Sequence, residues 1–329
     1  MEALQAVVAD APKMATVAIV PDHDPQRILQ ALRLGAREFL THPFSEDQVG
    51  TVLEKLSQFA PELASEQGRI FTFVPAKGAC GASTIAYNVA AGMKRSGSKE
   101  TLLADLDPHA GTQAFQLKLK PAFSFVDALG HASHLDVDIW RGIVQQASGF
   151  DVLLPPDSIT DGATDATDAR MLLEFAKRLY SNIVVDIGGA YGPWALSAVR
   201  SADEVIVVST NELPALQAAQ RVLNYYEANG IPRQRIRLVI NRFSRDVGLS
   251  KEMVETALQT DVYYVLPSDY EAVQRALLDG KPISQQSNLG KQLNLFAARL
   301  MGVEVRGKAV GKKTNSTTLS GLFSLFSRS

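Results

Sequence analysis

Short apolar runs alternate with amphipathic segments along most of the chain. Runs of Val, Ile and Leu at successive positions are typical of strands buried on both faces of a parallel sheet. These runs cover residues 70–74, 101–107, 151–155, 182–188, 204–210 and 237–243. Segments with helical spacing begin near Ser83, Asp165, Pro193, Leu213, Ser250 and Leu289. The pattern predicts an α/β fold, with a mostly parallel sheet covered by helices on both faces.

A smaller strand–helix–strand–helix pattern comes first, at residues 16–58. Its first helix is predicted to follow Asp24, the N-cap, with Pro25 in the first turn, and to end at Gly35. A polar, turn-rich stretch then separates this pattern from the longer region. We expect a small module at 1–60, a linker at 61–68, a main domain at 69–305 and a tail at 306–329.

Composition and charge exclude several classes of function. The 329 residues carry 33 basic and 35 acidic side chains, so the formal net charge is −2. This balance argues against a chain-wide nucleic-acid surface, and no nucleic-acid partner is expected. The single cysteine, Cys80, excludes a disulfide framework or a multi-cysteine cluster within one chain. No apolar run is long enough to span a bilayer and the first residues do not resemble a secretory signal, so we expect a cytoplasmic location.

The tail at 306–329 is basic, lacks acidic residues and is rich in Gly, Ser and Thr. Near its end Leu319, Leu322, Phe323 and Phe326 have the spacing of one helix face. Two interpretations stay open: a short amphipathic anchor for a membrane or a partner groove, or a disordered tail.

The segment 76–84, AKGACGAST, carries the strongest chemical signal. It follows an apolar strand and opens a helix, and its glycines let backbone N–H groups converge on an anion at the helix N-terminus. Ser83 stands where a phosphate-loop hydroxyl ligates Mg²⁺. The lysine expected before it is replaced by Ala82, whereas Lys77 is present at the start of the loop. The alternative is an ordinary tight turn between strand and helix.

These residues resemble the deviant Walker A ATPases of the MinD/ParA group, whose loop is typically K-G-G-x-G-K-[ST]. The resemblance implies ATP as the ligand and a homodimer formed across the nucleotide, with Lys77 reaching the partner's nucleotide as a catalytic residue. The ATP-contacting residues it implies are Lys77, Gly78, Ala79, Cys80, Gly81, Ala82, Ser83 and Thr84. Ala79 and Ala82 depart from the motif. Loss of the lysine weakens nucleotide binding by about tenfold or more, so we expect binding to persist with weak hydrolysis at most.

Carboxylates end two of the predicted strands, Asp105 and Asp107 in one and Asp186 in another. The carboxyl ends of neighbouring parallel strands meet at the ligand crevice, and Mg²⁺ shared with phosphates needs only one or two such oxygens. The alternative is turn or cap chemistry. The MinD/ParA resemblance implies that Asp107 orients the attacking water. It also implies a Mg²⁺ site formed by Ser83 and, through water, by Asp107 and Asp186.

The same resemblance extends to the base of the nucleotide. It implies that Asn241 and Arg242, in LVINRF, lie beside the adenine together with Pro267 and Asp269. For Asn241 an ordinary role at the end of a strand is the competing explanation.

The N-terminal pattern at 16–58 resembles the last strand–helix segments of a response-regulator receiver domain, with His42 in place of the usual lysine before Pro43. The half that would carry the phospho-acceptor aspartate is absent from this chain, so we infer a docking or dimerisation module. A receiver-like module before a MinD-like domain resembles the CpaE/TadZ family of Tad (Flp) pilus assembly proteins. That resemblance implies Tad secretion components as partners and a location at the cell pole or inner membrane face.

Three functions follow from these expectations. The first is a nucleotide-dependent dimeric scaffold or localisation factor. The second is an active ATPase that drives spatial positioning, and Ala82 argues against it. The third is a nucleotide-free pseudo-ATPase adaptor; the motif residues Ser83, Asp107 and Asp186 argue against that.

Overall fold

The structure is a computed structural model. It describes residues 16–303 except 22–23, 59–67, 99, 132–133, 158–165, 245 and 247, together with residues 4 and 7. The chain divides into two compact units, Met1–Gln67 and Gly68–Ser329. Residues 61–67 of the expected linker (61–68) and the whole tail at 306–329, with its Leu and Phe pattern, lie outside the described residues.

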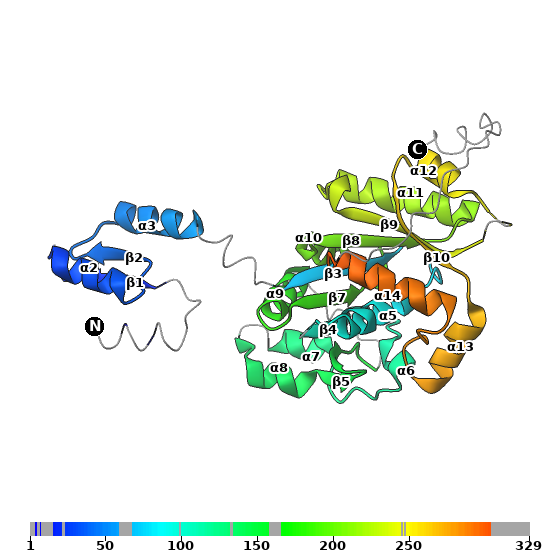
Figure 1. Ribbon diagram of the computed structural model, residues 1–329, viewed down its shortest axis with the longest axis horizontal. Helices are drawn as coiled ribbons and strands as arrows, with labels where there is room; N and C mark the ends of the chain where they lie inside the picture. Colours follow the sequence, from blue (N-terminus) through cyan, green and yellow to red (C-terminus); the bar gives the residue numbers. More distant parts are fainter. Residues whose placement is uncertain are drawn as a thin grey trace. The chain divides into compact units, whose positions relative to one another are not determined.

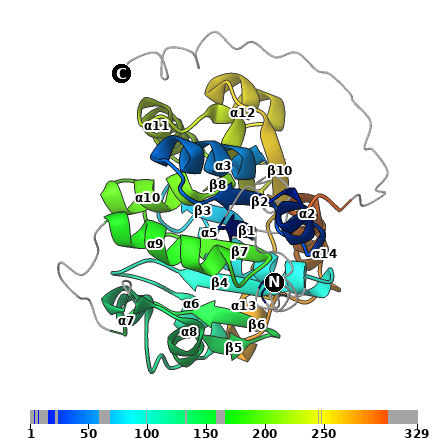
Figure 2. The same ribbon diagram turned by 90° about the vertical axis from the view of Figure 1, so that its left-hand side faces the viewer.

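The N-terminal unit contains a pair of parallel strands, β1 (Val17–Val20) and β2 (Glu38–Thr41). Between them runs α2 (Pro25–Arg33), and α3 (Glu46–Gln58) follows β2. The two helices lie on different sides of the strand pair (Figures 1 and 2). Asp24 caps α2 by accepting a hydrogen bond from the Gln26 N–H at 2.9 Å, as its sequence position predicts.

The larger unit contains an eight-stranded sheet in the order β10-β9-β8-β3-β7-β4-β6-β5. All neighbouring strands are parallel except the β5–β6 pair. The strands are β3 (Arg69–Pro75), β4 (Thr101–Asp105), β5 (Gln145–Ala147), β6 (Phe150–Leu153), β7 (Asn182–Asp186), β8 (Glu204–Ser209), β9 (Ile236–Phe243) and β10 (Val262–Pro267). The parallel strands all end at one edge, where β3, β4 and β7 deliver the predicted site segments.

Helices cover both faces of this sheet (Figures 1 and 2). They are α5 (Ala82–Arg95), α6 (Gln113–Leu117), α7 (Phe125–Gly130), α8 (Val137–Ile143), α9 (Ala166–Lys177), α10 (Pro193–Ser201), α11 (Leu213–Ala228), the short 3₁₀ helix η2 (Arg233–Arg235), α12 (Lys251–Leu258), α13 (Tyr270–Asp279) and α14 (Asn288–Leu300). One apolar cluster packs α5 and α14 on one face, and a second packs α9, α10 and α11 on the other. Gly92 lets α5 approach α14 closely, because a Cβ there would lie 2.7 Å from the Ala297 Cβ.

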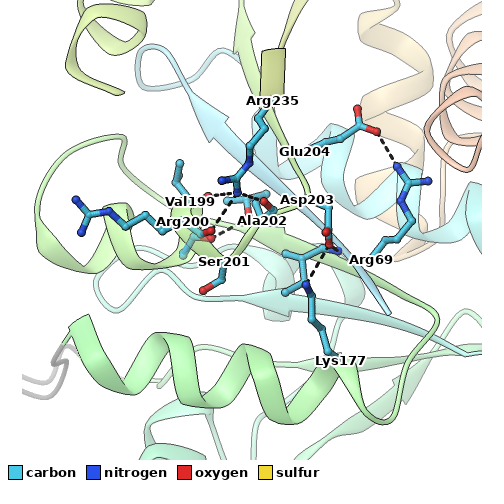
Figure 3. A network of polar contacts seen from close by, with 12 residues as sticks. Arg69, Lys177, Val199, Arg200, Ser201, Ala202, Asp203, Glu204 and Arg235 are labelled. Atoms are coloured by element: carbon cyan, nitrogen blue, oxygen red, sulfur yellow. Dashed lines mark hydrogen bonds and ion pairs between the residues drawn. The ribbon is translucent and has the colours of Figure 1, made fainter. Parts of the chain in front are cut away.

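The amino ends of the central strands are joined by charged side chains (Figure 3). Glu204 pairs with Arg69 at 2.7 Å and with Arg237 at 2.8 Å. Asp203 pairs with Lys177 at 3.4 Å. These charges compensate each other within the chain.

Arg235 belongs to the same network (Figure 3). Its guanidinium donates hydrogen bonds to carbonyl oxygens at the C-terminal end of α10, those of Val199, Arg200 and Ala202. The residue therefore caps α10 from η2.

The predicted fold class is confirmed. Every predicted strand of the main domain is present, although several end one or two residues earlier than the apolar run. The α12 and α14 helices begin one residue after Ser250 and Ser287, which cap them. The sequence analysis gave no assignment for β5, β10, α6, α7, α8 or α13. Among the described residues no helix is both long and apolar enough to cross a membrane.

Candidate functional site

The loop between β3 and α5 is shaped for an anion. Lys77, Gly78 and Ala79 are exposed, whereas Cys80 is buried. The backbone is left-handed at Ala79 (φ 63°) and at Gly81 (φ 91°), which turns the chain sharply into α5. The loop therefore lies across the N-terminus of a 14-residue helix, where free N–H groups and the helix dipole favour a phosphate.

The end of β9 packs against this loop. The Asn241 side-chain amide donates a hydrogen bond to the Cys80 carbonyl at 2.8 Å. A Cβ on Gly81 would lie 2.5 Å from that amide nitrogen and 4.0 Å from an Arg242 guanidinium nitrogen. Glycine at 81 thus permits the close approach, and Arg242 brings a positive charge to the loop. The Asn241 side chain is thus hydrogen-bonded to the loop, and its contact with the adenine base remains a prediction.

Ala82, which stands in the lysine position, is the first residue of α5 and only 4% exposed. It belongs to the apolar cluster that contains Cys80 and Ile85. Burial raises the pKa of the Cys80 thiol, so this cysteine packs as a small apolar group and is not an activated nucleophile. The loop consequently offers backbone N–H groups to an anion but lacks the lysine ammonium group that is usual at position 82.

Two buried carboxylates face each other beside the loop. Asp105 and Asp186 end β4 and β7 and are register partners in the sheet. Burial, followed by the charge of Asp186, raises the pKa of Asp105 well above its usual range. Burial and the charge of Asp107 raise the pKa of Asp186 to about 6, although polar groups of Gln113 and Ser83 oppose this increase.

Asp107 lies in the turn that follows β4. Its Oδ1 accepts hydrogen bonds from the N–H groups of His109 at 2.9 Å and Ala110 at 3.0 Å. A Cβ on Gly188 would lie 1.7 Å from Asp107 Oδ2, so glycine at 188 leaves room for this carboxylate. The structure thus brings Asp107 and the segment after β7 together, as the sequence predicts for a shared crevice.

Gln113 is a site residue that the sequence analysis missed. Its side-chain amide donates to the Ser83 carbonyl at 2.9 Å and to Asp186 Oδ2 at 2.8 Å. Its backbone N–H donates to Asp105 Oδ2 at 3.0 Å. The only sequence signal is a polar residue shortly after the Asp107 turn, which does not distinguish it from an ordinary helix start.

The donor set suits Mg²⁺. Ser83, Asp107 and Asp186 all offer oxygen atoms, which are the ligands this hard cation prefers. Within the described residues, Asp186 Oδ1 and Gln113 Oε1 are buried without a hydrogen-bond partner. No group of three or more His, Cys, Asp or Glu side chains there forms a metal cage by itself. The arrangement fits a cation held jointly with phosphates.

The last predicted residues lie at the next strand along. Pro267 ends β10 and pairs with Phe243 of β9. It therefore lies beside the end of β9 that carries Asn241 and Arg242. Asp269 Oδ1 accepts a hydrogen bond from the Ala272 N–H at 3.1 Å and caps α13. Capping of α13 accounts for an aspartate at position 269 without any bound nucleotide. The position of Asp269 beside the adenine base stays a prediction.

Comparison with known proteins gives a consistent result. No protein-family model matches the chain. The septum site-determining protein MinD of Thermotoga maritima is 25% identical over 263 residues, which cover 77% of this chain and 93% of that protein. A ParA family ATPase from Chlorobium tepidum has a TM-score of 0.66 at 24% identity, covering 71% of this chain and 99% of its own. MinD from Pyrococcus horikoshii, solved with Mg-ADP, has a TM-score of 0.62 at 19% identity and covers 73% and 99%.

The fold and the loop define an α/β protein of the P-loop class. The structural matches establish the fold, and the sequence match to MinD extends over nearly that protein's whole length. This chain is therefore homologous to the MinD/ParA P-loop ATPases.

Proposed function

We propose that this protein binds ATP with Mg²⁺ and acts as a nucleotide-dependent dimeric scaffold or localisation factor in Tad (Flp) pilus assembly, with weak ATP hydrolysis at most. The observation that supports this most is the loop across the N-terminus of α5, which lies beside Asp105, Asp107 and Asp186 and has alanine at position 82.

In this proposal the loop amides from Gly78 to Thr84 hold the phosphates, as N–H groups at a helix N-terminus do. Ser83 and, through water, Asp107 and Asp186 would hold Mg²⁺, which neutralises phosphate charge when bound. Asp107 orients the attacking water, and its two backbone hydrogen bonds fix the carboxylate for that task. Lys77, exposed on the loop, reaches the nucleotide of the second protomer.

Weak hydrolysis follows from Ala82. A charge-assisted contact to phosphate is worth about 1.5–3 kcal/mol. Without it, the charge that develops in the transition state has fewer compensating groups, so the rate falls more than the affinity. A scaffold needs the nucleotide-bound state to last, and slow turnover suits that requirement.

The scaffold role also draws on the N-terminal unit, which in this proposal is a receiver-like docking module. Its strand pair and helices expose apolar side chains, with Ile19 63%, Leu29 54% and Leu53 60% exposed. In this proposal these side chains contribute to the surface that a partner covers. Tad secretion components are the proposed partners, the proposed location is cytoplasmic at the pole or inner membrane face, and the tail is a proposed peripheral contact.

Calorimetric titration of ATP with Mg²⁺, followed by sedimentation with and without ATP, tests the nucleotide step. We expect measurable binding and a shift from monomer to dimer in ATP. Absence of heat and of any shift would instead support a nucleotide-free adaptor. Fast ATP turnover would support an active positioning ATPase.

The pilus role requires a cellular test. We expect a fluorescent fusion of the full chain to form a focus that is lost when residues 1–60 are removed. We also expect pili to be absent without the protein and restored by the wild type. Normal piliation in its absence would contradict the role. Truncation at Thr314 tests the tail separately, and unchanged localisation would remove the anchor interpretation.

A further inference from the structure

Gln113 is a fully buried amide side chain, with 0% exposure, at the first position of α6. Nothing in the proposed nucleotide chemistry uses it. It nevertheless touches the N-terminal turn of α5 through Ser83 and the end of β7 through Asp186. A buried amide at the meeting point of three site segments calls for a physical explanation.

The contacts fix which way the amide faces. Both of its close neighbours, the Ser83 carbonyl and Asp186 Oδ2, are oxygen acceptors at 2.9 and 2.8 Å. The NH₂ group must therefore point toward them, since the reverse orientation would place oxygen against oxygen. Gln113 Oε1 is left on the other side, and among the described residues it meets no donor.

Asp186 presents the same situation. Oδ2 accepts the Gln113 amide, while Oδ1 is buried without a hydrogen-bond partner in the described part of the chain, and the Ser83 side chain is the other polar group beside this carboxylate. Native proteins rarely leave buried acceptors unpaired, and such groups are often explained by an ion or a water. Gln113 and Asp186 are hydrogen-bonded to each other, and each has one unpaired oxygen. A single ion or water bound by both side chains would satisfy the two oxygens.

We propose that Gln113 is a further residue of the magnesium site. Its Oε1 binds Mg²⁺ or a water of its shell, and its NH₂ group orients Asp186 at the same time. This inference rests on the proposed nucleotide function, because it names another ligand-binding residue of the same site. It also connects cation binding to the start of α6, since Gln113 begins that helix.

The test compares three variants of the full chain. Gln113→Leu removes both halves of the amide and keeps a similar volume. Gln113→Glu removes the donor but keeps oxygen toward the cation. Gln116→Leu is the matched control, because Gln116 is the other buried glutamine of α6 and its amide binds only Thr112 Oγ1, at 3.0 Å, among the described side chains.

The first measurement is the ratio of ADP affinities in Mg²⁺ and in EDTA. We expect Gln113→Leu to reduce this ratio about tenfold, which corresponds to about 1.4 kcal/mol. Gln113→Glu should keep the ratio or raise it, although its melting temperature in EDTA should fall because a further carboxylate joins Asp105, Asp107 and Asp186. Gln116→Leu should match the wild type. A wild-type ratio in Gln113→Leu, or a Gln113→Glu ratio as low as that of Gln113→Leu, would overturn the inference.

The second measurement uses Mn²⁺ as a spin probe on the nucleotide-free protein. Because the phosphates that complete the site are absent here, we expect the wild type and Gln113→Glu to bind Mn²⁺ only weakly, and Gln113→Leu to bind it at least tenfold more weakly still. If ADP binds no variant but this Mn²⁺ pattern holds, the nucleotide function fails and the cation role of Gln113 stands. Equal Mn²⁺ binding by all variants would refute that role.

Discussion

Charged side chains are arranged differently at the two ends of the strands of the main sheet, which are called here the amino edge and the carboxyl edge. At the amino edge, Glu204 pairs with Arg69 and Asp203 pairs with Lys177 (Figure 3). Glu204 also pairs with Arg237. At the carboxyl edge, acidic groups gather at the ends of β4 and β7. No ion pair compensates them among the described residues, and burial raises the pKa of the two strand-end aspartates.

The difference separates structural electrostatics from functional electrostatics. Paired charges at the amino edge satisfy each other and join strand ends to helices. Buried like charges at the carboxyl edge are a local conflict that costs stability until a cation binds. Proteins concentrate such conflicts at sites of binding or catalysis. Substitutions at the two edges should therefore have opposite effects on stability and ligand binding.

The largest expected effect comes from Asp186→Asn. The change removes one of two facing carboxylates, so the metal-free protein should melt at a higher temperature. At a hundredfold excess of Mg-ADP over its dissociation constant, the wild type should gain about 2.7 kcal/mol of stability. The variant should gain less than about 0.5 kcal/mol under those conditions. Thermal unfolding with and without Mg-ADP measures both quantities.

Asp203→Asn is the control at the amino edge. It weakens the contact with Lys177 and should lower the melting temperature, yet it should leave the gain from Mg-ADP unchanged. Equal behaviour of the two aspartate variants would contradict the distinction between the edges.

The next effect should come from Arg235→Met. The methionine keeps much of the side chain's apolar length but removes the hydrogen bonds to the end of α10. We expect the free energy of unfolding to fall by about 1–2 kcal/mol, because several helix carbonyls lose a charged donor. Denaturant titration measures this, and the affinity for Mg-ADP should not change. Arg170→Met, on the exposed side of α9, should leave both properties as in the wild type.

Much of the fold was predictable because its signals are local. Apolar runs such as 183–185 and 205–208 are typical of strands buried on both faces, and helix caps such as Ser250 are evident from the sequence. The edge strand β10 was missed, because the only residue in it that was assigned from the sequence was Pro267, as part of the base site. Strand β5 was missed because three residues with two glutamines give no strand signal.

Candidate site residues could be predicted where they belong to a sequence motif. They could not be predicted where their role depends on contacts between residues far apart in the chain. Gly81, Ser83, Asp107 and Asp186 were proposed as site residues from their order along the chain, and their ligand roles stay predictions. Gln113 was not, because its role comes from a turn that returns it to Ser83, 30 residues away. Capping of α13 by Asp269 also required coordinates, since the same aspartate fits a ligand role in the motif.

Ala82→Lys sharpens the comparison by adding a positive charge to the carboxyl edge. We expect ATP affinity to rise about tenfold, because a charge-assisted contact to phosphate is restored. Hydrolysis should rise as well. Ala82→Met is the matched control, since it places a stem of similar length in the same buried position without charge. Calorimetry and a phosphate-release assay measure the two effects. Lower affinity and lower hydrolysis in Ala82→Lys than in Ala82→Met would show that the loop geometry differs from that of a lysine-bearing loop.

The smallest effect should come from Arg242→Gln. The Arg242 guanidinium lies beside Gly81 and is the positive charge that β9 brings to the loop. It is exposed, so its attraction for phosphate is screened, and its loss should weaken ATP binding only about threefold, or roughly 0.6 kcal/mol. Raising the salt concentration should reduce the difference between variant and wild type, whereas Arg170→Gln should bind ATP as the wild type does at every salt concentration. A loss of tenfold or more that persists in high salt would mean that Arg242 has taken over the role of the missing lysine, and the carboxyl edge would then carry a compensating cation of its own.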